Sequence, residues 1–113
     1  IVDTELFGPV LSVMRFDDEA EVLQRANDSK YGLAAGIFTA NQARAMRMTQ
    51  SVNAGIVWVN TYRMVSPIAP FGGFKASGYG RESGMQAIYD YTRPKTAWIN
   101  ISDDPIANPF VMR

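Results

Sequence analysis

The sequence contains no cysteine and no histidine. Without cysteine there can be no disulfide and no thiolate nucleophile, and without histidine there is no imidazole base. A zinc site of the ordinary kind needs these same side chains, so no metal site is predicted. An enzyme built from this chain alone would have to work with carboxylates, lysine or tyrosine.

An excess of charge is also absent, because 11 Lys and Arg residues balance 11 Asp and Glu residues. Nucleic-acid binding normally requires a basic excess, so no nucleic-acid partner is predicted. The sequence has no apolar run long enough to span a membrane and no basic-then-apolar signal peptide at its start. We therefore expect a soluble, cytoplasmic protein without a membrane partner.

The length of 113 residues suits one domain with a modest core. The first residue is Ile1 rather than methionine. This start suggests that the chain begins inside a longer protein, although processing or removal of a tag would leave the same start.

Glycine is concentrated in residues 70–84, which contain five of the nine glycines. Phe71, Phe74 and Tyr79 lie in the same stretch and predict a loop packed on a core rather than a flexible linker. The Gly-x-Gly-x-x-x-Gly spacing from Gly78 differs by one residue from the dinucleotide fingerprint, and no phosphate-binding P-loop motif is present. An ordered glycine-rich loop of this kind usually lines or supports a site.

Alternating helix and strand patterns predict an α/β fold with a parallel sheet. In such sheets, ligands meet the loops that follow the carboxyl ends of the strands. The loop over residues 61–80 follows the clearest strand, so it is the predicted place for a ligand. The predicted strands are residues 10–16, 33–39, 56–60 and 95–101, and the predicted helices are residues 17–27, 42–52 and 81–91.

Four short motifs at consistent spacing give a more specific signal. They are Glu-Leu-Phe-Gly-Pro at residues 5–9, Gly-Ile-Val-Trp-Val-Asn at 55–60, Pro-Phe-Gly-Gly at 70–73 and Ser-Gly-Tyr-Gly-Arg-Glu at 77–82. With these motifs, nearly the whole chain resembles the C-terminal part of the aldehyde dehydrogenase superfamily. The resemblance implies that residues 1–93 belong to the parallel-sheet catalytic domain and residues 94–113 form an oligomerisation strand and tail.

What the resemblance implies is oxidation of an aldehyde to a carboxylic acid with NAD or NADP. The family's cysteine nucleophile, its general-base glutamate and its dinucleotide-binding domain would lie upstream, so no catalytic residue is assigned here and the segment alone should be inactive. Glu5 matches the glutamate that hydrogen-bonds the ribose, and Phe7 matches the aromatic that packs against the nicotinamide. A turn cap and a core aromatic are the alternative roles for these two residues.

The same resemblance places Phe71, Met64 and Val65 at the substrate tunnel, with a plain core role as the alternative for Phe71. Arg63 could favour a substrate with an anionic end, or it could be a solvated, structural arginine. The family also implies a homo-oligomer, here through Thr96, Ala97, Trp98, Ile99, Asn100 and Ile101.

Two further hypotheses come from residues that follow the glycines. Arg81 and Glu82 are interpreted as an ion pair or helix-start pair that braces the loop, and Glu82 is a second-choice candidate for assisting proton movement. A chain without a nucleophile could also be a non-enzymatic oligomerisation or ligand-binding module of α/β type.

Overall fold

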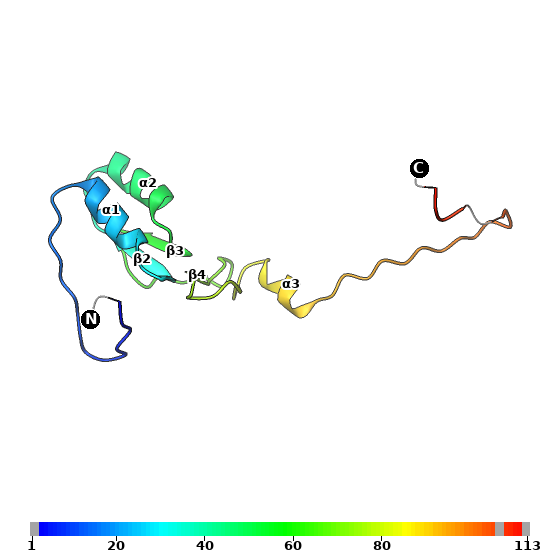
Figure 1. Cartoon of the computed structure of the whole chain (residues 1–113), viewed down its shortest axis with the longest axis horizontal. Coiled ribbons are helices and arrows are strands. Elements are labelled where there is room, and N and C mark those ends of the chain that lie inside the picture. The colour runs from blue at the N-terminus through cyan, green and yellow to red at the C-terminus, as the bar shows by residue number, and fades with distance from the viewer. Residues whose placement is uncertain (1–2, 106–107, 112–113) are drawn as a thin grey trace.

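The computed structural model describes residues 3–105 and 108–111, and it shows a small α/β unit followed by a long extended tail (Figure 1). The α/β unit comprises two helices beside short strands, and the chain leaves it through the glycine-rich loop and a short third helix. The radius of gyration is 22.8 Å. A compact domain of this length would have a value of about 13 Å. The chain is therefore far more extended than a free-standing domain.

Both long helices begin at the side-chain caps that the sequence predicts. Helix α1 spans Glu19–Asn27, and the Asp18 carboxylate accepts a hydrogen bond of 2.8 Å from the Glu21 amide. Helix α2 spans Gln42–Ser51, and the Asn41 side chain accepts one of 2.9 Å from the Arg44 amide. Each cap satisfies an amide that the helix itself leaves without a partner. The predictions for these two helices are confirmed.

The parallel sheet is confirmed for two strands. Strand β2, Ala34–Ile37, pairs in parallel with β3, Ile56–Val59, and the register runs from Ala34 opposite Ile56 to Ile37 opposite Val59. Helix α2 connects them, as the β-α-β rhythm predicts. The core lies under this helix, where Met48 is buried with 9% of its surface exposed.

A second, antiparallel pair was not predicted. Strand β1, Tyr31–Gly32, pairs with β4, Phe74–Lys75, and so ties the glycine-rich loop to the α/β unit. A Cβ atom at Gly32 would lie 2.8 Å from the Asn53 carbonyl oxygen and 3.2 Å from Phe74 Cβ. Glycine is therefore needed where these segments meet.

The prediction of a strand over residues 10–16 is wrong. These residues are exposed and form no strand; Leu11 and Val13 are 85% and 82% exposed. Within residues 3–105 and 108–111, no segment offers this stretch a ladder of hydrogen bonds. An apolar, β-branched sequence sets a preference for strand, but a strand forms only with a partner edge.

The predicted helix over residues 81–91 forms only in part, as helix α3, Ala87–Tyr91. The residues before α3 are not helical, because Glu82 forms an isolated antiparallel bridge with Phe71. Ser83 and Gly84 follow with φ angles of 63° and 64°, in the left-handed region. A right-handed helix cannot run through such residues, so it begins only after them.

Residues 95–101 have no secondary structure in the described chain, and Trp98 is 94% exposed. The pairing of this stretch with another subunit stays a prediction. Among the helices of the described residues, none is long and apolar enough to cross a membrane.

Candidate functional site

The site that the sequence predicts begins where the parallel strands end. Asn60 follows β3 with a φ of 53°, and its amide donates to the Ile37 carbonyl over 2.8 Å. Its side chain accepts from the Thr39 amide at 2.9 Å and donates to the Thr39 carbonyl at 3.0 Å. Asn60 thus joins the two strand ends and fixes where the following loop starts.

The glycine-rich loop is folded back on itself. The Phe71 amide donates to the Glu82 carbonyl at 2.6 Å, and the Glu82 amide donates to the Phe71 carbonyl at 2.7 Å. The Gly84 amide donates to the Pro67 carbonyl at 2.9 Å. These bonds close residues 67–84 into an ordered loop, as the aromatic and glycine content predicts.

Arg81 stabilises this loop through backbone carbonyl groups. Its guanidinium donates to the carbonyls of Gly73 at 2.9 Å and Gly80 at 2.8 Å, and it lies 5.3 Å from the centre of the Phe74 ring. Among the described residues no ion pair joins Arg81 to Glu82, so that part of the prediction is wrong. Arg81 does brace the loop, because one guanidinium satisfies several carbonyls at once.

A hollow of about 390 Å³ lies against this loop. Three of the residues predicted to bind substrate, Met64, Val65 and Phe71, line it together. Ile56, at the start of β3, lines it too, so the loop that leaves the end of this strand returns to its beginning. Most of the remaining lining is apolar, with Glu82, Ser66 and Ser83 as its polar members.

Sequence reasoning missed Ser83 as a neighbour of Phe71. Both residues line the hollow because of the bridge between Phe71 and Glu82, and nothing in the sequence marks that pairing. Arg63 is not among the residues that line the hollow, although it immediately precedes Met64 in the chain.

Arg63 lies beside two packed aromatic residues, Trp58 and Tyr62. Trp58 donates its indole N–H to the Met64 carbonyl at 2.7 Å, and its ring meets the Tyr62 ring edge-on with centroids 5.4 Å apart. The Arg63 guanidinium carbon lies 5.5 Å from the centre of the Tyr62 ring. Arg63 has a φ of 59°, a left-handed conformation that is uncommon for residues other than glycine.

The residues predicted to bind the cofactor lie in a different place. Glu5 and Phe7 line one shallow hollow at the start of the chain, and Glu5 also lines another with Tyr31 and Ser77. Phe7 is 94% exposed and has a φ of 48°, so its ring stands free for packing against a planar group. The proximity of Glu5 to Tyr31 and Ser77 could not be predicted, because it depends on the β1–β4 pairing.

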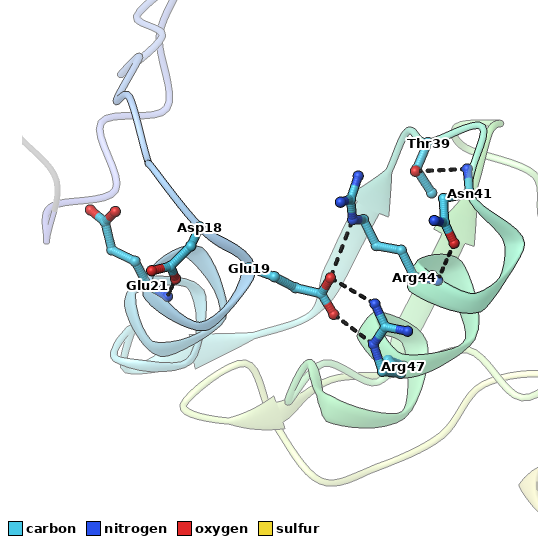
Figure 2. A network of polar contacts seen from close by, with 7 residues as sticks. All are labelled: Asp18, Glu19, Glu21, Thr39, Asn41, Arg44 and Arg47. Carbon is cyan, nitrogen blue, oxygen red and sulfur yellow. Dashed lines mark hydrogen bonds and ion pairs between the residues drawn. The ribbon is translucent and has the colours of Figure 1, made fainter.

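A network of charged side chains lies away from the hollow at the glycine-rich loop and from the hollows at the start of the chain. Figure 2 shows Glu19 of α1 between Arg44 and Arg47 of α2, with N–O distances of 3.2 Å and 2.9 Å. The hydrogen bond from Arg47, together with that from Arg44, lowers the pKa of Glu19, and the Glu19 carboxylate raises the pKa of Arg47. This network joins the two helices. Within the described ranges, no group of three acidic residues is placed to hold a metal ion.

Comparison with known proteins bears on the whole chain. Residues 1–97 match the model of the aldehyde dehydrogenase family. The chain is 60% identical over 112 residues to the (Z)-2-((N-methylformamido)methylene)-5-hydroxybutyrolactone dehydrogenase of Acinetobacter baylyi. The aligned region covers 99% of this chain and 23% of that protein.

Solved structures agree with this match. PnpE from Pseudomonas sp. WBC-3 is 47% identical with a TM-score of 0.84, covering 96% of this chain and 22% of that one. The NAD⁺ complex of aldehyde dehydrogenase from Bacillus cereus is 47% identical with a TM-score of 0.83. The match covers 88% of this chain and 20% of the Bacillus cereus chain. The chain therefore spans about a fifth of the length of the proteins it matches.

Proposed function

This chain belongs to the aldehyde dehydrogenase family, and we propose that it is the C-terminal segment of a longer enzyme that oxidises an aldehyde to a carboxylic acid with NAD or NADP. We refer to that longer protein as the parent enzyme. The observation that carries the proposal is the family match over residues 1–97, together with 60% identity to a dehydrogenase over 112 residues.

The segment supplies binding groups rather than the reacting ones. It has no cysteine, so the nucleophile comes from elsewhere in the parent enzyme, and the general-base glutamate is assigned to that upstream part as well. When bound, the nicotinamide accepts the hydride that the aldehyde carbon gives up. On its own, the segment is inactive.

Glu5 and Phe7 position the cofactor. In the part of the chain that the structure describes, the Glu5 carboxylate has no recorded hydrogen bond, so its oxygens are available to accept from the two hydroxyls of a ribose. The exposed Phe7 ring offers a flat apolar surface for the nicotinamide end. These two side chains therefore suit the nicotinamide and its ribose, and the rest of the dinucleotide is assigned to the upstream part of the parent enzyme.

Met64, Val65 and Phe71 form the wall that contacts the substrate. Their hollow is mainly apolar, which suits the carbon skeleton of an aldehyde. The loop bonds between Phe71 and Glu82 hold the Phe71 ring at this wall, so the width of the hollow is set by the folded loop.

The relative that is 60% identical is named for a 5-hydroxybutyrolactone substrate. A lactone with a hydroxyl on the carbon next to its ring oxygen interconverts with an open-chain aldehyde acid. We include such masked aldehydes among the candidate substrates of the parent enzyme.

The tail supplies an assembly element. We propose that residues 96–101 pair with another subunit in a homo-oligomer, because Trp98, Ile99 and Ile101 are all exposed in the single chain. Exposed apolar stretches that can form an unpaired strand promote association.

The proposal is tested by expressing the parent enzyme and measuring the formation of NADH or NADPH by its absorbance. Aldehydes of increasing size are supplied with NAD⁺ or with NADP⁺. We expect aldehyde-dependent reduction, and we expect Glu5→Gln to slow it. Failure of every aldehyde with both cofactors would refute the proposed function.

A further inference from the structure

We propose that Arg63 is an anion-recognition residue that selects aldehydes carrying a carboxylate at the end remote from the reacting carbon. This inference rests on the proposed function and adds the class of substrate to it. Four features of the structure support it: the guanidinium lies over the Tyr62 ring, it has no carboxylate partner among residues 3–105 and 108–111, its backbone conformation is unusual, and Arg63 immediately precedes two residues that line the hollow.

A chain of contacts positions the Arg63 guanidinium. The indole N–H of Trp58 holds the Met64 carbonyl at 2.7 Å, which fixes the loop immediately after Arg63. Tyr62 packs edge-on against Trp58, and the Arg63 guanidinium lies over the Tyr62 ring at 5.5 Å. A cation held over an aromatic face keeps its N–H groups free at its edge. Less entropy is then lost when an anion binds there.

The charge of Arg63 is not used within the described residues. Arg25, Arg44 and Arg47 are paired with carboxylates, and Arg81 donates to backbone carbonyls. For residues 3–105 and 108–111, the structure records neither an ion pair nor a hydrogen bond from the Arg63 side chain. An arginine oriented in this way can hold a carboxylate through two parallel hydrogen bonds.

The backbone supports the same conclusion. Arg63 has a φ of 59°, and such a conformation costs a residue with a side chain free energy that glycine would not lose. Glycine at this position would relieve the strain, yet the sequence has arginine there. Strained residues of this kind are frequent at ligand sites.

The hollow gives the substrate a direction. Met64 and Val65 continue from Arg63 into its mainly apolar lining, so a short carbon skeleton can lie there with its anionic end at Arg63. Glu82 is the acidic residue among those that line the hollow. Its carboxylate repels an anionic substrate, whereas Arg63 attracts one. We therefore expect Glu82 and Arg63 to have opposite effects on the preference for an anionic aldehyde.

Three aldehydes of matched shape test the proposal in the parent enzyme. They are 4-oxobutanoate, its neutral counterpart 4-methylpentanal, and the cationic 3-(trimethylammonio)propanal. We expect the wild-type kcat/KM to be highest for 4-oxobutanoate. Arg63→Gln should lower that value about 10- to 100-fold, mainly through KM, and leave the neutral aldehyde within about twofold.

The variants separate recognition from a structural role. Arg63→Lys should retain part of the preference, since a lysine keeps the charge without the two-pronged donor. Glu82→Gln should increase the preference for 4-oxobutanoate over the cation. Arg15→Gln is the control: Arg15 is exposed and has no recorded side-chain partner in the described chain, so its removal should change nothing.

Four results would contradict the proposal. Equal losses on all three aldehydes with Arg63→Gln would show that Arg63 only supports the loop. A wild-type preference for the cationic aldehyde would show that Glu82 governs selection and would overturn the anion site. If 4-methylpentanal is oxidised without any preference for 4-oxobutanoate, the anion site is wrong and the dehydrogenase function stands. If none of the three is oxidised with NAD⁺ or NADP⁺, the proposed function fails as well.

Discussion

Replacing Gly55 with alanine should loosen the contact between strand β3 and the glycine-rich loop. Gly55 immediately precedes β3, and a Cβ atom built there would clash with the Gly72 carbonyl oxygen and lie 2.9 Å from the Gly72 carbonyl carbon and 3.2 Å from Gly73 Cα. All three of these atoms belong to backbone, so no side chain can turn away. The backbone of the loop must move, and it carries Phe71.

Overpacking of this kind costs about 1–3 kcal/mol, and we expect the upper part of that range because backbone has to shift. Gly55 has no left-handed φ, so the cost is steric alone. Gly80 is the matched control, because a Cβ there meets nothing within 4 Å and its φ is also ordinary. Gly78 tests the other effect: its surroundings are equally open, but its φ of 109° strains any other residue.

Hydrogen–deuterium exchange on the parent enzyme measures the local free energy of opening. In Gly55→Ala, the amides of residues 67–84 should exchange about 5- to 150-fold faster, which is the range that corresponds to 1–3 kcal/mol. Gly80→Ala should leave exchange unchanged, and Gly78→Ala should accelerate it near the substituted residue. Unchanged exchange in Gly55→Ala, or equal acceleration in Gly80→Ala, would refute the close-approach argument.

Four other predictions concern different parts of the chain. Glu5→Gln in the parent enzyme should slow hydride transfer in single-turnover experiments more than it weakens cofactor binding, because a misplaced nicotinamide loses orientation; an unchanged rate would remove Glu5 from the cofactor site. Val65→Trp should discriminate against bulky aldehydes by about 1–3 kcal/mol in kcat/KM, whereas equal losses for acetaldehyde and benzaldehyde would place Val65 outside the hollow. Ile99→Pro removes a backbone donor and should shift the chain toward monomer in size-exclusion chromatography with light scattering; a wild type that is already monomeric would contradict this. The arginine partners lower the pKa of Glu19 below 4.5, so the stabilisation that Glu19 gives is complete above pH 4.5 and is lost as the pH falls through the lowered pKa. The protection factors of amides in α1 and α2, which are corrected for the intrinsic exchange rate at each pH, should therefore fall with acid, and Glu19→Gln should reduce that fall.

The two long helices and the parallel strands were predictable because their signals are local. Asp18 and Asn41 are side-chain caps that act within three residues, and β2 and β3 are apolar runs of ordinary length. The same kind of local signal predicted a strand over residues 10–16, which is wrong, and a helix over residues 81–91, which forms only in part. In the first case the described chain lacks a partner strand, and in the second the bridge to Phe71 and the left-handed Ser83 prevent a helix.

The candidate site shows the same division. The sequence indicated Met64, Val65 and Phe71 through a family motif, and the structure brings these three residues to one hollow. It could not indicate that Glu82 and Ser83 would line that hollow, or that Arg81 would bind carbonyl groups instead of Glu82. Those contacts depend on how a glycine-rich loop closes, and glycine restricts the backbone less than any other residue.

The most direct test of the central claim is a paired assay of cofactor reduction, with the 113-residue chain in one vessel and the parent enzyme in the other. Both receive the same aldehydes with NAD⁺ or NADP⁺. We expect the parent enzyme to reduce the cofactor in proportion to the aldehyde supplied, and the 113-residue chain, which has no cysteine, to show no rate above the blank. Aldehyde-dependent reduction by the 113-residue chain alone, or none by the parent enzyme, would contradict the account.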